Sequence, residues 1–269
     1  MSGLPPHAEH YLDLLRLTLT DFHRIGQGDG SRFFQPEPAS LAERQALRCA
    51  GRDWPGQGET MIGLERLRHL QSVIVTAVAE AVPGDIIETG VWRGGACILA
   101  RAVLRALSVT DRTVWVADSF AGLPPPRPHL YPADAGDSHH RETGLAVPRA
   151  EVEANFVKYG LMDRQVRFLE GWFSDTLPAA PMASLAVLRL DGDMYESTWV
   201  ALDALYDRVS PGGFIIVDDF GAVPACRAAV ETFRARRGID APLEEIDWTG
   251  RFWRVPRTMA QCHDRSGQS

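Results

Sequence analysis

Residues 85–95 read Asp-Ile-Ile-Glu-Thr-Gly-Val-Trp-Arg-Gly-Gly, and this stretch decides the fold. An apolar run ends in the acid Glu88, Gly90 follows, and a glycine pair comes shortly after. A helical pattern then begins. The order predicts a strand, a tight turn and the start of a helix, in which glycines let the backbone pass close to a ligand without a Cβ in the way. The spacing, acid-x-Gly-x-x-x-Gly-Gly, differs from the Gly-x-Gly-x-x-Gly of dinucleotide-binding proteins.

This stretch resembles the first motif of class I S-adenosylmethionine-dependent methyltransferases. The alternative is an ordinary strand-to-helix turn of an α/β protein. The motifs in the rest of the sequence distinguish these two interpretations.

Length and composition set the first limits. The chain has 269 residues, of which 45% are apolar, and this fits one α/β domain with additions or at most two small domains. The net charge is −7 and the chain has no basic block. This argues against nucleic-acid binding, because neutralising phosphates requires clustered Lys and Arg.

The cysteines and the N-terminus indicate the compartment. Cys49, Cys97, Cys226 and Cys262 lack the Cys-x-x-Cys spacing of zinc sites, so we expect free thiols. The N-terminus lacks the basic start and apolar stretch of a signal peptide, and no run is apolar enough to span a membrane. We expect a soluble, cytoplasmic protein without a membrane partner.

Hydrophobic periodicity predicts helices at 8–25, 41–48 and 63–81, after which strands and helices alternate. We expect strands at 85–88, 113–118, 166–170, 185–191 and 213–218, with helices at 94–107, 149–159, 195–208 and 224–237. Two late strands are expected at 243–247 and 252–255. This alternation predicts a mostly parallel, seven-stranded sheet with an antiparallel strand at its end. Ligands of such sheets bind at the carboxyl ends of the strands.

Three segments lie outside this pattern. Residues 51–58 hold Trp54 among Gly and Pro and are expected to form a loop. Residues 121–147 are rich in Pro, His and Asp, and loops this long inside compact domains are often functional lids. The polar tail, 257–269, is expected to be disordered.

Acids follow several of the predicted strands. Asp118 ends the second strand, about thirty residues after Glu88, which suits an acid that binds a ribose. Ser119 follows it directly. The alternative is that Asp118 only caps the next turn.

Four further acids, Asp191, Asp193, Asp218 and Asp219, end two strands. Neighbouring strands would bring them to one edge of the sheet, where carboxylates repel one another unless a cation lies among them. Hard oxygen ligands in this number suit Mg²⁺. The alternative is that these acids cap the helices that follow.

Methyl transfer to oxygen gives this arrangement a purpose. A divalent cation can orient an alcohol and lower its pKa, and a nearby carboxylate can then take its proton. Asp193 is the better candidate for this base, because Asp191 directly ends the strand and can point at the metal. A role for Asp193 as another ligand or as a helix N-cap stays open.

Other side chains suggest contacts with ligands. His139 and His140 lie in the long loop beside Asp137, where they could bind substrate or assist proton transfer. Trp172 follows the third strand, where an adenine could stack. Trp54 lies in a Gly/Pro loop and is a candidate for lining an acceptor pocket.

Together these residues resemble the macrocin O-methyltransferase family over 60–255. The matching stretches are 60–63, 83–85, 88–97, 113–120, 155–156, 159–161, 171–173, 189–193 and 210–219. The resemblance implies the class I methyltransferase fold, with an N-terminal helical lid at 1–60 and the methyltransferase domain at 61–256. It also implies homo-oligomers, and methylation of a deoxysugar hydroxyl on a glycosylated antibiotic scaffold with S-adenosylmethionine and Mg²⁺.

The resemblance also implies roles for individual residues. Metal ligands fall on Asp191, Asp218 and Asp219, and the general base on Asp193. Independently of the resemblance, the long loop offers His140 as a second catalytic candidate. Trp54 and His139 are the candidates for substrate contact. Cofactor contacts fall on Thr60, Met61, Glu88, Gly90, Asp118, Ser119 and Trp172. Two alternatives remain: a catechol-type methyltransferase that acts on a phenol, and a non-catalytic methyltransferase-like subunit.

Overall fold

The computed structural model describes residues 4–28, 30–33, 38 and 40–257. A seven-stranded sheet runs through its centre in the order β5-β4-β3-β6-β7-β9-β8. The strands β3 (Asp85–Thr89), β4 (Val114–Asp118), β5 (Val166–Glu170), β6 (Leu185–Leu190) and β7 (Val209–Val217) are parallel to their neighbours, whereas β9 (Arg251–Arg254) pairs antiparallel with β7 and with β8 (Glu244–Glu245). This confirms the predicted mostly parallel sheet.

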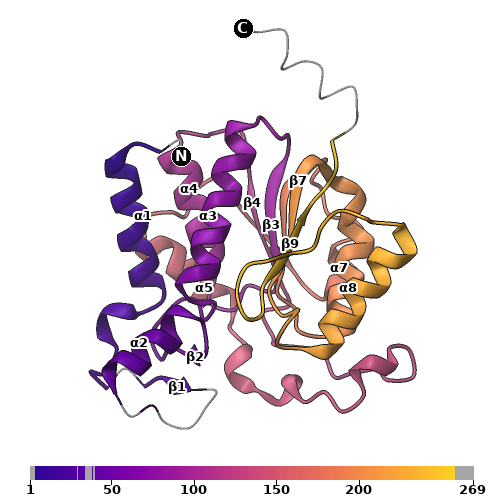
Figure 1. Cartoon of the computed structure of the whole chain (residues 1–269), viewed down its shortest axis with the longest axis horizontal. Coiled ribbons are helices and arrows are strands. Elements are labelled where there is room, and N and C mark those ends of the chain that lie inside the picture. The colour runs from indigo at the N-terminus through magenta and orange to yellow at the C-terminus, as the bar shows by residue number, and fades with distance from the viewer. Residues whose placement is uncertain (1–3, 29, 34–37, 39, 258–269) are drawn as a thin grey trace, which may run out of the picture.

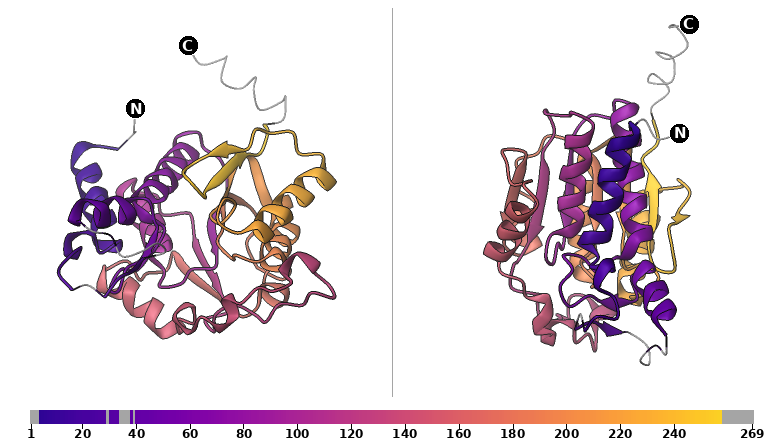
Figure 2. Two further views of the ribbon diagram at one scale, coloured as in Figure 1. Left: turned by 60° about the horizontal axis from the view of Figure 1, so that its bottom comes forward. Right: turned by 90° about the vertical axis from the view of Figure 1, so that its left-hand side faces the viewer.

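Helices cover both faces of the sheet (Figures 1 and 2). One face carries α1 (Pro6–Leu19), α3 (Gly63–Ala79), α4 (Gly95–Ala106) and α5 (Arg149–Lys158), and the other carries α6 (Phe173–Thr176), α7 (Tyr195–Leu205) and α8 (Pro224–Arg237). Successive strand residues point to opposite faces, so Ile86 joins the first core and its neighbour Ile87 the second. The near-continuous apolar strands follow from this burial on both faces.

The strand order reverses at β3, which has β4 on one side and β6 on the other. The chain leaves β3 at Gly90 and β6 at Asp191, so the glycine motif and the acids that follow β6 both lie at this switch point. Crevices at such points are where open α/β sheets bind ligands.

The first predicted helix, 8–25, is too long. Helix α1 ends at Leu19, Asp21 takes a left-handed conformation with φ of 56°, and the 3-10 turn η1 (Phe22–Arg24) follows. The buried Arg48, from α2 (Leu41–Cys49), donates hydrogen bonds to the main-chain oxygens of Thr20 (2.7 Å) and Asp21 (3.0 Å). A distant side chain therefore ends this helix, and local periodicity carries no sign of it. Leu12 and Leu19 are fully buried, and α1 packs in the same core as α3 and α4.

The predicted loop at 51–58 contains a short strand. There β2 (Asp53–Trp54) pairs antiparallel with β1 (Arg32–Phe33), and Asp53 forms a buried ion pair with Arg48 at 2.6 Å. The long segment 121–147 holds the 3-10 turns η2 (Pro132–Asp134), η3 (His139–Arg141) and η4 (Thr143–Leu145). It runs along the same end of the molecule as the strand pair β1–β2, at the bottom of Figure 1. The 3-10 turn η5 (Tyr206–Arg208) joins α7 to β7.

Among the described residues, no helix combines the length and the apolar character needed to cross a membrane. Cys49, Cys97 and Cys226 are free thiols. The prediction for the tail lies outside the described residues, apart from Arg257.

Candidate active site

One large cavity, of about 1120 Å³, opens at the carboxyl ends of the central strands. Nearly all the residues predicted from the sequence line it, although they are spread from position 54 to position 219. They are Trp54, Thr60, Met61, Glu88, Gly90, Asp118, Ser119, His139, Trp172, Asp191, Asp193, Asp218 and Asp219.

His140 is the exception among the predicted residues, because it does not line the cavity in the described structure. Its Nδ1 atom is buried and has no hydrogen-bond partner. The geometry therefore gives no support to a catalytic role for His140.

Asp118 ties the two cofactor-motif loops together. Its carboxylate accepts hydrogen bonds from the main-chain N–H groups of Val91 (2.7 Å) and Phe120 (2.8 Å). Burial raises the pKa of Asp118, and these two donors oppose the rise. The turn-capping alternative therefore describes part of its role, and ribose binding through the remaining lone pairs stays a prediction.

Glu88 is buried at the end of β3 and faces both a thiol and an arginine. It accepts a hydrogen bond from the Cys97 thiol at 2.9 Å and forms an ion pair with Arg189. Burial raises the pKa of Glu88, whereas the positive charge of Arg189 lowers it.

The Glu59 backbone and carboxylate place Thr60 and Met61 beside the start of α4. The Glu59 main-chain oxygen accepts the Gly95 N–H at 2.9 Å, and its carboxylate accepts the Tyr159 hydroxyl at 2.6 Å. Trp172, directly before α6, lines the cavity and has 38% of its surface exposed.

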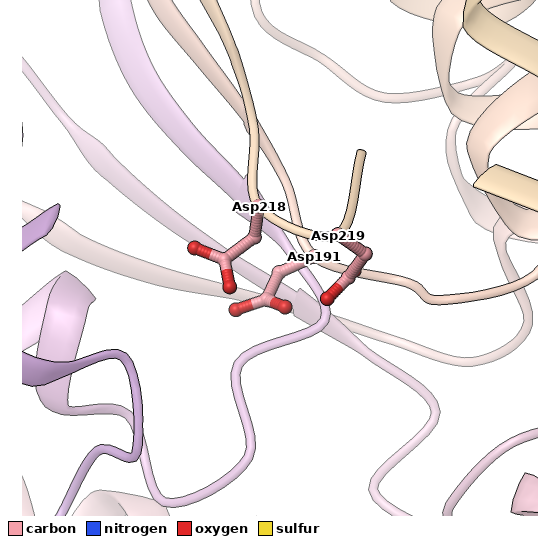
Figure 3. Close-up of side chains that lie close together, drawn as sticks. All are labelled: Asp191, Asp218 and Asp219. Atoms are coloured by element: carbon pink, nitrogen blue, oxygen red, sulfur yellow. The ribbon is translucent and has the colours of Figure 1, made fainter. Parts of the chain in front are cut away.

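Asp191, Asp218 and Asp219 form a carboxylate cluster. One oxygen from each lies within 4.8 Å of the others, and Figure 3 shows the three groups turned toward a common space. Burial and then the charge of Asp218 raise the pKa of Asp191 to about 8. Burial and then the charge of Asp193 raise that of Asp219 well above its usual range. The ionised cluster is therefore costly without a counter-charge.

Two buried arginines supply part of this counter-charge. Asp218 accepts from Arg189 on one oxygen and from Arg66 on the other. Arg189 also binds Asp191 at 2.6 Å, and Arg66 binds Asp247 at 3.0 Å. Sequence reasoning gave Arg189 no role, although a charged residue inside a strand as apolar as β6 was the available signal.

The helix-capping alternative does not account for these acids. The N-cap positions of α7 and α8 are Met194 and Val223, and neither makes a side-chain capping hydrogen bond. Asp219 instead accepts the main-chain N–H of Asp193 at 3.1 Å. Negative charge thus remains beyond what the two arginines balance, and three carboxylates in this arrangement fit a hard divalent cation such as Mg²⁺.

Asp193 lies beside the cluster in a left-handed backbone conformation with φ of 56°. This conformation is uncommon outside glycine, although Asp and Asn tolerate it better than most residues. Burial is the largest cause that raises the pKa of Asp193 to about 6, and the nearby charge of His139 opposes it. A carboxyl group with this pKa, open to the cavity, can exchange a proton near neutral pH.

His139 is held by Asp137. Its Nδ1 atom lies 2.7 Å from one oxygen of Asp137, and its main-chain N–H donates to the other at 2.9 Å. Burial lowers the pKa of His139, but the hydrogen bond to Asp137 and the charge of Asp193 outweigh it, so the net shift is upward.

Trp54 forms part of the roof of the cavity. Its ring lies 6.3 Å from that of Trp92, and the Arg32 guanidinium stacks on it at 4.2 Å. The Trp92 ring nitrogen donates to the Gly144 main-chain oxygen at 2.8 Å. The strand pair β1–β2 and the segment 121–147 therefore meet at Trp54, which lines the cavity and lies against Gly144.

The sequence matches the Macrocin-O-methyltransferase (TylF) family model over residues 8–255. A tetracenomycin-C rhamnosyl 4'-O-methyltransferase from Streptomyces olivaceus is 51% identical over 91% of this chain and 92% of its own length. The mycinamicin III 3''-O-methyltransferase from Micromonospora griseorubida is 48% identical over 91% of this chain and 96% of its own length.

A solved structure agrees with these sequence relatives. The O-methyltransferase NovP superposes with a TM-score of 0.86 at 47% identity, covering 93% of this chain and all of that one. The described cavity, with its acids at the strand ends, lies within the region that matches the family model. This chain therefore belongs to the macrocin O-methyltransferase (TylF) family and is an S-adenosylmethionine-dependent O-methyltransferase.

Proposed function

We propose that this enzyme methylates a hydroxyl of a deoxysugar on a glycosylated natural product and that it requires Mg²⁺ for the reaction. The observation that carries the proposal is a single cavity that is lined by the carboxylate cluster, by Asp193, and by Glu88 and Asp118, the two acids predicted to bind the cofactor. The two sequence relatives are named for glycosylated natural products, a rhamnosyl tetracenomycin and mycinamicin III, which supports the class of acceptor.

Asp191, Asp218 and Asp219 would hold the cation. Mg²⁺ bound there would orient the acceptor hydroxyl and lower its pKa. Asp193 takes the hydroxyl proton, since its carboxyl group faces the cavity and its pKa of about 6 suits a base near neutral pH. Arg189 and Arg66 keep the Asp218 carboxylate in place by binding both of its oxygens.

The acceptor side of the cavity offers polar groups as well as rings. His139, Arg127 and Glu196 line it together with Trp54. A sugar with several hydroxyl groups needs such partners, whereas the alternative acceptor, a flat phenol, would need little beyond stacking surfaces. Carboxylates also outnumber guanidinium groups along the wall, which favours an uncharged glycoside over a sugar that carries phosphates.

Calorimetry with S-adenosylhomocysteine, with and without Mg²⁺, tests the cofactor and metal parts. The acceptor part is tested by mass spectrometry of reactions with mycinamicin III and with the rhamnosylated tetracenomycin, alongside a simple catechol. We expect a gain of one methyl group on the glycosides and loss of turnover in EDTA that Mg²⁺ restores. Full turnover in EDTA would remove the metal from the proposal, and methylation of the catechol alone would replace the sugar by a phenol.

Assembly and location are separate parts of the proposal. We propose a homo-oligomer, as the family resemblance implied, and a location in the cytoplasm, which the free thiols favour. Light scattering of the purified protein gives the mass of the particle, and a monomer at micromolar concentration would overturn the first part.

A further inference from the structure

Asp134, in the middle of the segment 121–147, is a buried carboxylate with only 1% of its surface exposed. One of its oxygens accepts the Tyr195 main-chain N–H at 2.7 Å, and the other accepts that of Glu196 at 3.0 Å. Tyr195 and Glu196 are the first two residues of α7. A loop residue therefore caps a helix that begins about sixty residues later in the chain.

Helix α7 has no cap of its own. Its N-cap residue, Met194, makes no side-chain hydrogen bond to the first turn. The first N–H groups of a helix lack partners within the helix, and a carboxylate there satisfies them and interacts favourably with the helix dipole. The contact thus stabilises both elements, because it holds the loop in place and gives the first N–H groups of the helix a hydrogen-bond acceptor.

Two further contacts hold the same part of the loop. Arg127 forms an ion pair with Glu196, with Nε 3.1 Å from one carboxylate oxygen, and the Tyr131 ring lies 6.0 Å from that of Tyr195. Arg127 is nearly half exposed, so the ion pair contributes little by itself. Asp134 is the most buried member of this group, with 1% of its surface exposed against 7% for Glu196.

The contact joins two groups that face the cavity. Asp137 and His139 follow Asp134 closely on the loop, and Asp193 lies two residues before Tyr195. His139 and Asp193 both line the cavity, and each feels the charge of the other. Asp134 therefore connects the part of the loop that carries His139 to the start of the helix that follows Asp193.

We propose that Asp134 is a positioning residue that fixes the segment 121–147 to the N-terminus of α7 and so holds His139 opposite Asp193. The part that concerns Asp193 rests on the proposed function, whereas the part that concerns the segment does not. Capping contacts shift equilibria by roughly 5- to 30-fold. An interaction of this size holds the segment in place most of the time and still permits it to open for an acceptor.

Hydrogen exchange with mass spectrometry tests the first part in the full chain with S-adenosylhomocysteine bound. In Asp134→Ala we expect peptides from 121–147 to exchange roughly 5- to 30-fold faster, while peptides from β3 and α4 are unchanged. Asp134→Asn keeps one acceptor oxygen and should lie between this variant and wild type. Glu142→Gln, at an exposed position of the same segment, is the matched control. Unchanged exchange in 121–147, or an equal increase everywhere, would overturn the proposal.

Turnover tests the second part, with the glycoside that wild type methylates fastest. We expect kcat/KM for this acceptor to be highest in wild type, lower in Asp134→Asn and lowest in Asp134→Ala. The Kd of S-adenosylhomocysteine should stay within about twofold of the wild-type value. If Asp134→Ala does not fold, Asp134→Asn decides both measurements. Equal kcat/KM in all three proteins would overturn the link to Asp193. Absence of turnover by wild type with every glycoside would instead refute the proposed function, and the exchange experiment would still decide the first part.

Discussion

Gly90 faces the main-chain oxygen of Asp191 so closely that a Cβ at position 90 would overlap it. Gly90 also has a positive φ of 88°. The sequence suggested that this glycine makes room for a ligand, but the structure shows that it also lets the ends of β3 and β6 meet. The glycine motif after β3 and the strand that leads to the carboxylate cluster are joined at this contact.

Gly90→Ala should therefore destabilise the protein and weaken S-adenosylhomocysteine binding at the same time. The left-handed backbone alone costs about 1–2 kcal/mol for a residue with a Cβ, and the overlap adds to this. Gly238→Ala is the control, since Gly238 has φ of 60° and no atom within 4 Å of the added Cβ. Urea unfolding compares the two variants. Equal losses of stability would show that the contact with Asp191 carries no cost of its own.

Arg189 leads to a second prediction, because it balances Glu88, Asp191 and Asp218 at once. Arg189→Met would leave these carboxylates buried without their shared partner, and breaking a buried ion pair in this way costs about 3–5 kcal/mol. Chemical denaturation measures the loss of stability.

The matched control is Arg101→Met. Arg101 is about as buried, with 6% of its side chain exposed, but its partner Asp163 is 38% exposed and can turn to water. We expect a clearly smaller loss in Arg101→Met. A loss of stability of the same size in both variants would mean that Arg189 stabilises the cavity carboxylates no more than Arg101 stabilises the exposed Asp163.

The sequence predicted the sheet well because its strands are apolar runs separated by glycine and helical patterns. The sequence pattern did not predict interactions between residues that are far apart in the chain. The end of α1 depends on Arg48, and the support of Asp218 depends on Arg66 and Arg189, from two separate elements. The carboxylates themselves were predictable, because parallel strands bring their carboxyl ends to one edge.

The two loop histidines show a different limit. Adjacent residues in an irregular segment point in directions that no periodicity determines, so sequence reasoning could not choose between His139 and His140. The choice is made by Asp137, which binds the ring and the backbone of His139. Both hydrogen bonds join residues two positions apart, so the Asp-x-His spacing in the sequence could have favoured His139 over His140.

We expect the free energy of unfolding to fall in acid because of the buried side chain of His69. Its ring packs 4.4 Å from that of Phe252, and burial, followed by the charge of Arg189, lowers its pKa to about 4, with Asp247 acting in the opposite direction. The unfolded chain binds a proton at this residue below its ordinary pKa of about 6.5, and the folded chain does so only near 4. Stability from this group is therefore complete above pH 6.5 and falls by about 3 kcal/mol as the pH drops to 4.

His69→Phe keeps an aromatic ring and removes the titrating nitrogen. We expect its free energy of unfolding, measured in urea between pH 7 and 4, to decrease less steeply than that of wild type. Parallel curves for the two proteins would show that His69 is not the source of the acid sensitivity.

Asp193→Asn is the sharpest test of the catalytic assignment. Asn adopts the left-handed conformation of residue 193 about as readily as Asp, so the backbone and its hydrogen bond to Asp219 should persist. The amide cannot take the proton of the acceptor hydroxyl, and loss of a general base lowers turnover by about 10²- to 10⁴-fold. The Kd of S-adenosylhomocysteine should change little, because Asp193 lies beside Asp219 and is not among the residues predicted to contact the cofactor. A variant that binds the cofactor product normally and keeps full kcat would move the base to another group, and His139, held by Asp137 and facing the same cavity, would be the next to test.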